Sequence, residues 1–196
     1  EARESDYVDR NSGVSARMPI SLFETLLSAM ERRAAINGES RACARIADLY
    51  AALPAITGKI ELVYKGEQEG ADKVAEHLIG KAVKERFNSM FVPNYRHGRH
   101  TEHEFEEFAE TIGWFERGNT LDLDDAMPHA ELDRQLRQIP GLRRMAQKAF
   151  PRENGLAQAS LMEFLLEGLA QNFALSKFKL ITGTRYADEL SVMQKS

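Results

Sequence analysis

The recurrence of apolar residues at intervals of three and four is the feature that most constrains how this chain folds. Such a period places one apolar stripe along an α-helix, and that stripe must be buried against another element. Long helices are expected over residues 19–37, 71–91, 101–118 and 156–175. Shorter helices are expected over residues 44–53, 129–138 and 142–150. The pattern therefore predicts a predominantly all-α fold with two helical clusters.

At most one short β element is expected. Residues 59–65 alternate between polar and apolar side chains, with Ile60 and Leu62 on one face. A lone strand is marginal in water. This segment therefore needs a partner strand, which a region preceding the chain would be able to supply.

The turn at Pro93-Asn94 separates the two helical clusters and is the expected domain boundary. We expect a helical domain over residues 1–92 and a second helical domain over residues 93–196. The second domain is expected to end in a polar tail of little pattern, from Lys177 to Ser196.

Composition excludes several classes of protein. The 196 residues are 43% hydrophobic, which is enough for one good core or two small ones, and the net charge of -4 argues against nucleic acid as a partner. No stretch approaches the roughly 20 apolar residues that span a bilayer, so no membrane partner is expected. Cys43 is the single cysteine, which fits a reducing, cytoplasmic compartment. The start at Glu1, without Met or a signal peptide, leads us to expect a fragment.

A phosphate-binding loop is absent from the sequence. Gly58-Lys59 is followed by Ile60 and lacks the upstream glycine of GxxxxGK[ST], the motif whose backbone amides hold nucleotide phosphates. We therefore expect that this chain by itself does not bind or hydrolyse ATP in the usual way.

The segment from Arg10 to Pro19, RNSGVSARMP, places an arginine at the entry to the first long helix. It resembles the S-x-R signature that opens the lid subdomain of AAA+ ATPases. Further segments look like the magnesium-chelatase ATPase-subunit branch of that family: residues 23–26, 29–34, 45–50, 58–62, 139–142 and 163–169. The resemblance thus extends over nearly the whole chain, and it implies an AAA+ lid-type helical bundle followed by a second helical cluster.

The resemblance implies that Arg17 is the sensor 2 arginine, whose guanidinium lies against the γ-phosphate of ATP. A planar cation stabilises the charge that builds on phosphoryl oxygens during transfer. A helix start disfavours a cation, and a nearby anion would relieve that cost. The alternative is a solvent-facing arginine without a functional contact. Arg10 is a second, weaker candidate, for a subunit interface.

The family resemblance also implies the partners. The full-length protein would form a homo-oligomeric ring, a hexamer or heptamer, that binds ATP and Mg mainly through a region preceding this chain. The ring would remodel a partner protein, and the family's partner is a protein with a von Willebrand factor A domain. A second interpretation is a free-standing α-helical interaction module without nucleotide chemistry.

Other polar groups are expected to be structural. His97, His100 and His103 have glutamates nearby, and these residue types are metal ligands. Ordering an exposed loop around a metal costs conformational entropy, so no metal site is expected. The acidic run over residues 122–125 is typical of solvated caps and turns, with Asp124 or Asp125 capping the following helix. The Arg32-Arg33 pair is expected on a solvated face.

Overall fold

The structure is a computed structural model, and it describes residues 1–11, 13–92, 105–153 and 155–188. It is mostly helical, as the apolar periods predict, with a small three-stranded sheet. The helices are α1 (Met18–Ile36), α2 (Ile46–Ala51), α3 (Pro54–Thr57), α4 (Tyr64–Glu69), α5 (Ala71–Phe91), α6 (Ala109–Glu116), α7 (His129–Leu136), α8 (Leu142–Ala149) and α9 (Leu156–Gln171). The strands are β1 (Leu121–Asp124), β2 (Ser176–Leu180) and β3 (Gly183–Ala187). In the described ranges no helix is both long and apolar enough to cross a membrane.

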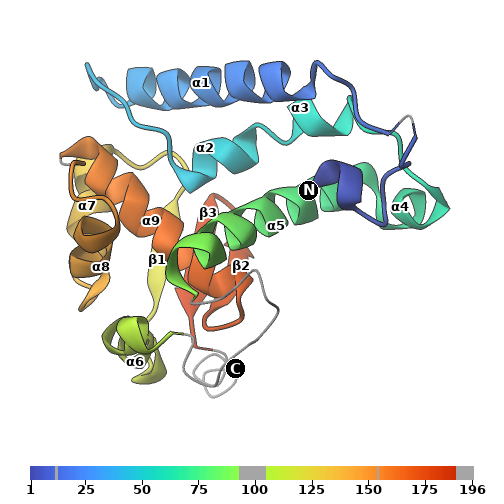
Figure 1. Cartoon of the computed structure of the whole chain (residues 1–196). Coiled ribbons are helices and arrows are strands. Elements are labelled where there is room, and N and C mark those ends of the chain that lie inside the picture. The colour runs from blue at the N-terminus through green and yellow to red at the C-terminus, as the bar shows by residue number, and fades with distance from the viewer. Residues whose placement is uncertain (12, 93–104, 154, 189–196) are drawn as a thin grey trace.

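The N-terminal half places α1 as an outer layer over α2 and α3 (Figure 1). Pro19 lies in the first turn of α1, where its missing N–H costs no hydrogen bond, and Gly38 follows the helix with a φ of 66°. The core of this half lies mainly between α3 and α5 and includes Ile56, Val74 and Leu78. Only Arg33 and Ala34 of α1 are buried, so most of this helix is at least partly open to solvent.

The expectation of at most one β element near residues 59–65 is wrong. Ile60 and Leu62 form only isolated bridges, to Val14 and Val8 respectively, and α4 begins directly after them. The partner for this segment is therefore the lead-in before α1. The bridges fix the path by which the chain enters that helix.

The sheet comes from the segments after residue 120, including the tail expected to carry little pattern. β2 and β3 form an antiparallel hairpin, and β1 pairs with β3 in the order β1-β3-β2. The strands are four or five residues long and carry charges at alternate positions, for example Lys177 and Lys179. Such short strands give a weak apolar period, and that is why sequence analysis missed them.

The C-terminal half is built around α9, which is buried over most of its length. α9 packs against α7 and α8, and its close neighbour on the other side is α5 (Figure 1). Phe87 of α5 belongs to this second core, so α5 contributes to both hydrophobic clusters. The expected boundary at Pro93-Asn94 lies outside the described residues. The helix expected over 101–118 is described as a short 3-10 turn, Glu106–Phe108, followed by α6.

Candidate functional site

The start of α1 presents Arg17 to solvent. Arg17 is the N-cap residue of α1, and its backbone N–H donates to Ser15 Oγ at 3.3 Å. Within the described part of the chain its guanidinium makes no hydrogen bond or ion pair. One and two turns further along α1, Ile20 and Phe23 are 61% and 60% exposed. The chain therefore offers an unpaired cation beside uncovered apolar side chains.

Arg10 lies in the lead-in before α1 and is exposed. Its Nη2 atom is 3.3 Å from Asp6 Oδ1, an ion pair four residues apart with both side chains largely in solvent. Exposed pairs of this kind contribute little stability. The guanidinium can therefore leave Asp6 at small cost, which is compatible with the interface role expected for it.

A buried ion pair joins α1 to α2. Arg33 donates from Nε to Asp48 Oδ1 at 3.0 Å and from Nη2 to Asp48 Oδ2 at 2.8 Å, and both side chains are almost fully buried. Arg33 Nη2 also donates to the Cys43 carbonyl at 2.9 Å. The expectation of a solvated Arg32-Arg33 pair is therefore wrong for Arg33, while Arg32 is exposed. The two differ because a helix turns consecutive residues about 100° apart.

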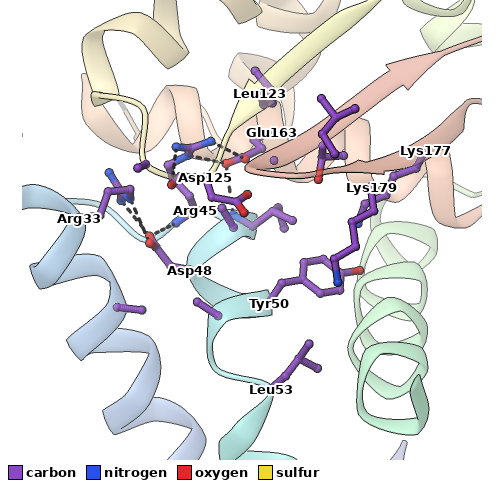
Figure 2. A pocket seen from close by; sticks show the side chains of 18 of the residues that line it. Arg33, Arg45, Asp48, Tyr50, Leu53, Leu123, Asp125, Glu163, Lys177 and Lys179 are labelled. Carbon is purple, nitrogen blue, oxygen red and sulfur yellow. Dashed lines mark hydrogen bonds and ion pairs between the residues drawn. The ribbon is translucent and has the colours of Figure 1, made fainter. Parts of the chain in front are cut away.

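A second buried pair joins α2 to α9. Arg45, the residue before α2, donates to both carboxylate oxygens of Glu163 at 3.3 and 3.1 Å, and its side chain is fully buried. The backbone N–H of Ile46 also donates to Glu163, at 3.2 Å. The backbone N–H of Arg45 donates to Asp48 Oδ2 at 2.9 Å. Asp48 therefore accepts hydrogen bonds from both arginines and links the two pairs (Figure 2).

Glu167 lies one turn beyond Glu163 and is the centre of a third polar cluster. Its carboxylate accepts hydrogen bonds from Tyr50 and Tyr186 at 2.7 Å each, and from Gln171 and Lys177 at 2.9 Å each. Burial opposes ionisation, yet the Lys177 ammonium and these donors hold the pKa of Glu167 below its ordinary value. Burial and the negative charge of Glu167 raise the pKa values of both phenols.

A cavity of about 340 Å³ lies beside these clusters, between α1, α2 and the sheet (Figure 2). Asp125 faces it, and burial raises the pKa of this carboxyl more than the nearby Arg45 guanidinium lowers it. A second pocket, about 440 Å³ in volume and open to solvent, has a mainly apolar lining that includes Leu26, Cys43 and Phe164. Arg45 lines both cavities.

The acidic run differs in part from its expected role. Asp122 forms a two-pronged pair with Arg185 at 2.7 Å, which holds the pKa of Asp122 below its usual range. Asp124 accepts from the N–H of Ala126 at 2.7 Å, as expected for a turn. Neither Asp124 nor Asp125 caps α7, whose N-cap residue is Pro128 without a side-chain cap.

The buried carboxylates of the site, those of Asp48, Glu163 and Glu167, are all paired with cations of the same chain. Across the described ranges there is no group of three or more His, Cys, Asp or Glu that could hold a metal ion, and His97, His100 and His103 lie outside those ranges.

Sequence reasoning missed Arg33, Arg45, Glu163 and Glu167. A signal for the glutamates was present, because both interrupt an otherwise apolar helix at a spacing of four residues. No family model, curated protein or solved structure matches this chain.

Proposed function

We propose that this chain is the C-terminal lid and helical part of a ring-forming AAA+ ATPase of the magnesium-chelatase type. In this proposal residues 1–92 form the lid, and the second helical cluster couples ATP hydrolysis to the remodelling of a partner protein. The single observation that carries the proposal is Arg17, an exposed and unpaired guanidinium at the first turn of the long helix α1. The S-x-R segment that contains it is the sequence basis for the resemblance.

The role of Arg17 follows from charge. The N-terminus of a helix carries a partial positive charge, so a cation there is slightly unfavourable until an anion approaches. A γ-phosphate held by a neighbouring subunit would accept hydrogen bonds from both the guanidinium and the open helix end. ATP and Mg would be bound mainly by a region outside this chain, and Arg17 would supply the lid's contact to the phosphate.

The exposed apolar residues of α1 support a macromolecular neighbour on the same face. Ile20 and Phe23 follow Arg17 at spacings of three and six residues, so the arginine and the apolar side chains share one side of the helix. Covering them would stabilise an interface by burying apolar area. In the proposed ring, that cover is the adjacent subunit. A von Willebrand factor A-domain protein remains the proposed partner on the ground of the resemblance alone.

The test measures ATP hydrolysis by the full-length gene product, comparing wild type with Arg17→Ala. Loss of a phosphate-contacting arginine is expected to lower turnover by about a hundredfold or more. Arg32→Ala is the matched control, because Arg32 is also exposed on α1 but lies at the opposite end. Light scattering verifies that the size of the oligomer is unchanged. Equal turnover of wild type and Arg17→Ala with an intact ring would refute the proposal.

The second candidate is a free-standing helical interaction module without nucleotide chemistry. The observation that favours it is the same uncovered face of α1, which would then bind a partner without any phosphate. The gene sequence preceding Glu1 discriminates between the two candidates. A P-loop and an acidic Walker B strand there would support the ATPase, and their absence would support the module.

A further inference from the structure

The loop between β1 and α7 is held by side chains from the other half of the molecule. Asn37, at the end of α1, donates from Nδ2 to the carbonyl of Ala126 at 2.8 Å. Glu39 accepts the backbone N–H of His129 through Oε1 at 2.7 Å. Both contacts join residues about 90 positions apart in the sequence. The end of α1 is therefore bonded directly to the residues that begin α7.

Arg45 holds the same loop from within. While Nε and Nη2 bind Glu163, Nη1 lies within hydrogen-bonding distance of three backbone carbonyls, those of Asp124 at 3.2 Å, Met127 at 3.3 Å and Asp125 at 3.4 Å. One buried side chain thus binds α9 and the loop together. Such directional contacts weaken steeply when donor and acceptor are displaced.

Arg45 is in turn tied to α1. Asp48 accepts hydrogen bonds from the Arg33 guanidinium and from the Arg45 backbone, so the position of α1 constrains the position of Arg45. A displacement of α1 therefore acts on the loop by two routes. One route is direct, through Asn37 and Glu39, and the other passes through the two ion pairs.

The joint between α2 and α9 lies next to two pockets that open to solvent. The pockets have volumes of about 340 and 440 Å³, and Arg45 and Ile46 line both of them. Buried polar contacts of Arg45 with Glu163 therefore form a main part of this joint, whereas α5 and α9 meet through close apolar packing.

We propose that the β1–α7 loop is a coupling element that transmits displacements of α1 to α7 and the sheet. The Arg45–Glu163 ion pair, called the latch below, holds this loop in place. The coupling itself does not depend on nucleotide. Its use by a bound γ-phosphate at Arg17 rests on the proposed function. Binding at the exposed face of α1 would shift Arg33, loosen Arg45 and release the loop. Reciprocally, loosening the latch must alter the dynamics of α1.

The first test uses the single tryptophan, Trp114, as a reporter of the C-terminal half, and circular dichroism as a reporter of all helices. The chain is unfolded in urea with both probes. In the wild type the two transitions are expected to coincide. In Arg45→Met they are expected to separate, because the halves lose the Arg45 contacts with Glu163 and with the β1–α7 loop. Arg185→Gln is the matched control. It also breaks a two-pronged arginine–carboxylate pair, but that pair lies within the sheet.

The second test uses milder variants that keep the fold, measured by hydrogen exchange. Glu163→Gln removes the charge from a buried ion pair and is expected to accelerate exchange of the loop amides of Asp125, Met127 and His129 by about tenfold. Asn37→Ala removes one exposed hydrogen bond to the loop and is expected to accelerate the same amides by a smaller factor. Glu163→Gln is also expected to accelerate exchange in the last turn of α1. A purely local structural role for Glu163 would leave that turn unchanged.

The proposal is overturned if the two urea transitions of Arg45→Met coincide as they do for Arg185→Gln, or if Glu163→Gln leaves the last turn of α1 at the wild-type exchange rate. These experiments contain no ATP. Failure of the Arg17 test would therefore remove the proposed ATPase role and leave the coupling in place, while failure here would leave the ATPase proposal standing.

Discussion

Gly168 of α9 lies directly against Phe87 of α5, and adding one methyl group there tests how the core is packed. A Cβ atom at this position would lie 2.1 Å from Cδ2 and 2.8 Å from Cβ of Phe87 on α5. Ordinary contacts between carbon atoms are about 3.5–4.0 Å. Gly168→Ala therefore requires α5 and α9 to separate or the Phe87 ring to move.

Neither adjustment is easy. Phe87 is fully buried, and its ring lies 5.0–6.4 Å from the ring centroids of Phe91, Phe105, Phe108 and Phe164. Overpacking of such a core costs about 1–3 kcal/mol, and the overlap here is large enough to place the cost at about 3 kcal/mol. Replacing glycine by alanine inside a helix returns about 1 kcal/mol. The net expectation is a loss of about 2 kcal/mol, or about 4–8 °C in Tm for a chain of this size.

The assay is urea unfolding followed by Trp114 fluorescence. Gly113→Ala in α6 is the matched control, because the nearest atoms to its added Cβ are the ends of flexible side chains at 3.6 and 3.8 Å. It gains helix propensity without overlap and should stabilise the chain by about 0.5–1 kcal/mol. A double-mutant cycle with Phe87→Ala should give a coupling energy of at least about 1 kcal/mol. If Gly168→Ala proves neutral or stabilising, the close approach of α5 and α9 is wrong.

Two further predictions concern buried titratable groups. His129 donates from Nε2 to the Leu156 carbonyl at 2.6 Å, while Nδ1 is buried without a partner among the described residues, and burial lowers the pKa of His129. The unfolded chain therefore binds a proton first, and stability should fall as the pH drops below about 6.5, the ordinary histidine value. His129→Gln should lose this part of the pH dependence, and urea unfolding from pH 5 to 8 would measure it; parallel curves for the two proteins would contradict the reasoning. Glu167→Gln leaves the Lys177 ammonium without its carboxylate and should cost about 3 kcal/mol in the same assay at pH 7, whereas Glu76→Gln, which breaks an exposed pair at 3.5 Å, should change stability by less than about 0.5 kcal/mol.

The long helices could be predicted from sequence because their evidence is local. The apolar stripe that ends at Phe91 predicts α5 over residues 71–91, and the structure has it over the same residues. α1 was expected to begin at Pro19 and begins one residue earlier, since a proline in the first turn marks a helix start without fixing its first residue. Periodicity summed over several turns outweighs the ambiguity of any single position.

The hairpin and the ion pairs could not be predicted because what determines them is distant in the sequence. The apolar pattern of β2 and β3 is weak. These strands are stabilised by the pairing of β3 with β1, which lies more than fifty residues earlier in the sequence. Arg45 and Glu163 are 118 residues apart, and a stripe along one helix does not specify which distant cation will face an interrupting carboxylate. Arg17 was proposed from a motif, and its contact with a γ-phosphate stays a prediction. The structure shows that Arg17 is exposed, as the alternative of a solvent-facing arginine also expects.

The retention of charges inside the joint between α2 and α9 is itself informative. Taking a guanidinium and a carboxylate out of water costs several kcal/mol per ion, and well-packed apolar residues of similar volume are often at least as stable. Stability alone therefore does not favour Arg45 and Glu163 at this joint. The ion pair provides directional contacts, which apolar packing does not. Arg45 makes five separate hydrogen bonds that fix the relative orientation of α2, α9 and the β1–α7 loop. Transmission of a displacement from one half to the other requires a contact that breaks over a short distance and in a defined direction. Hydrogen bonds of the Arg45 guanidinium meet this requirement. Close apolar packing has no such directional dependence.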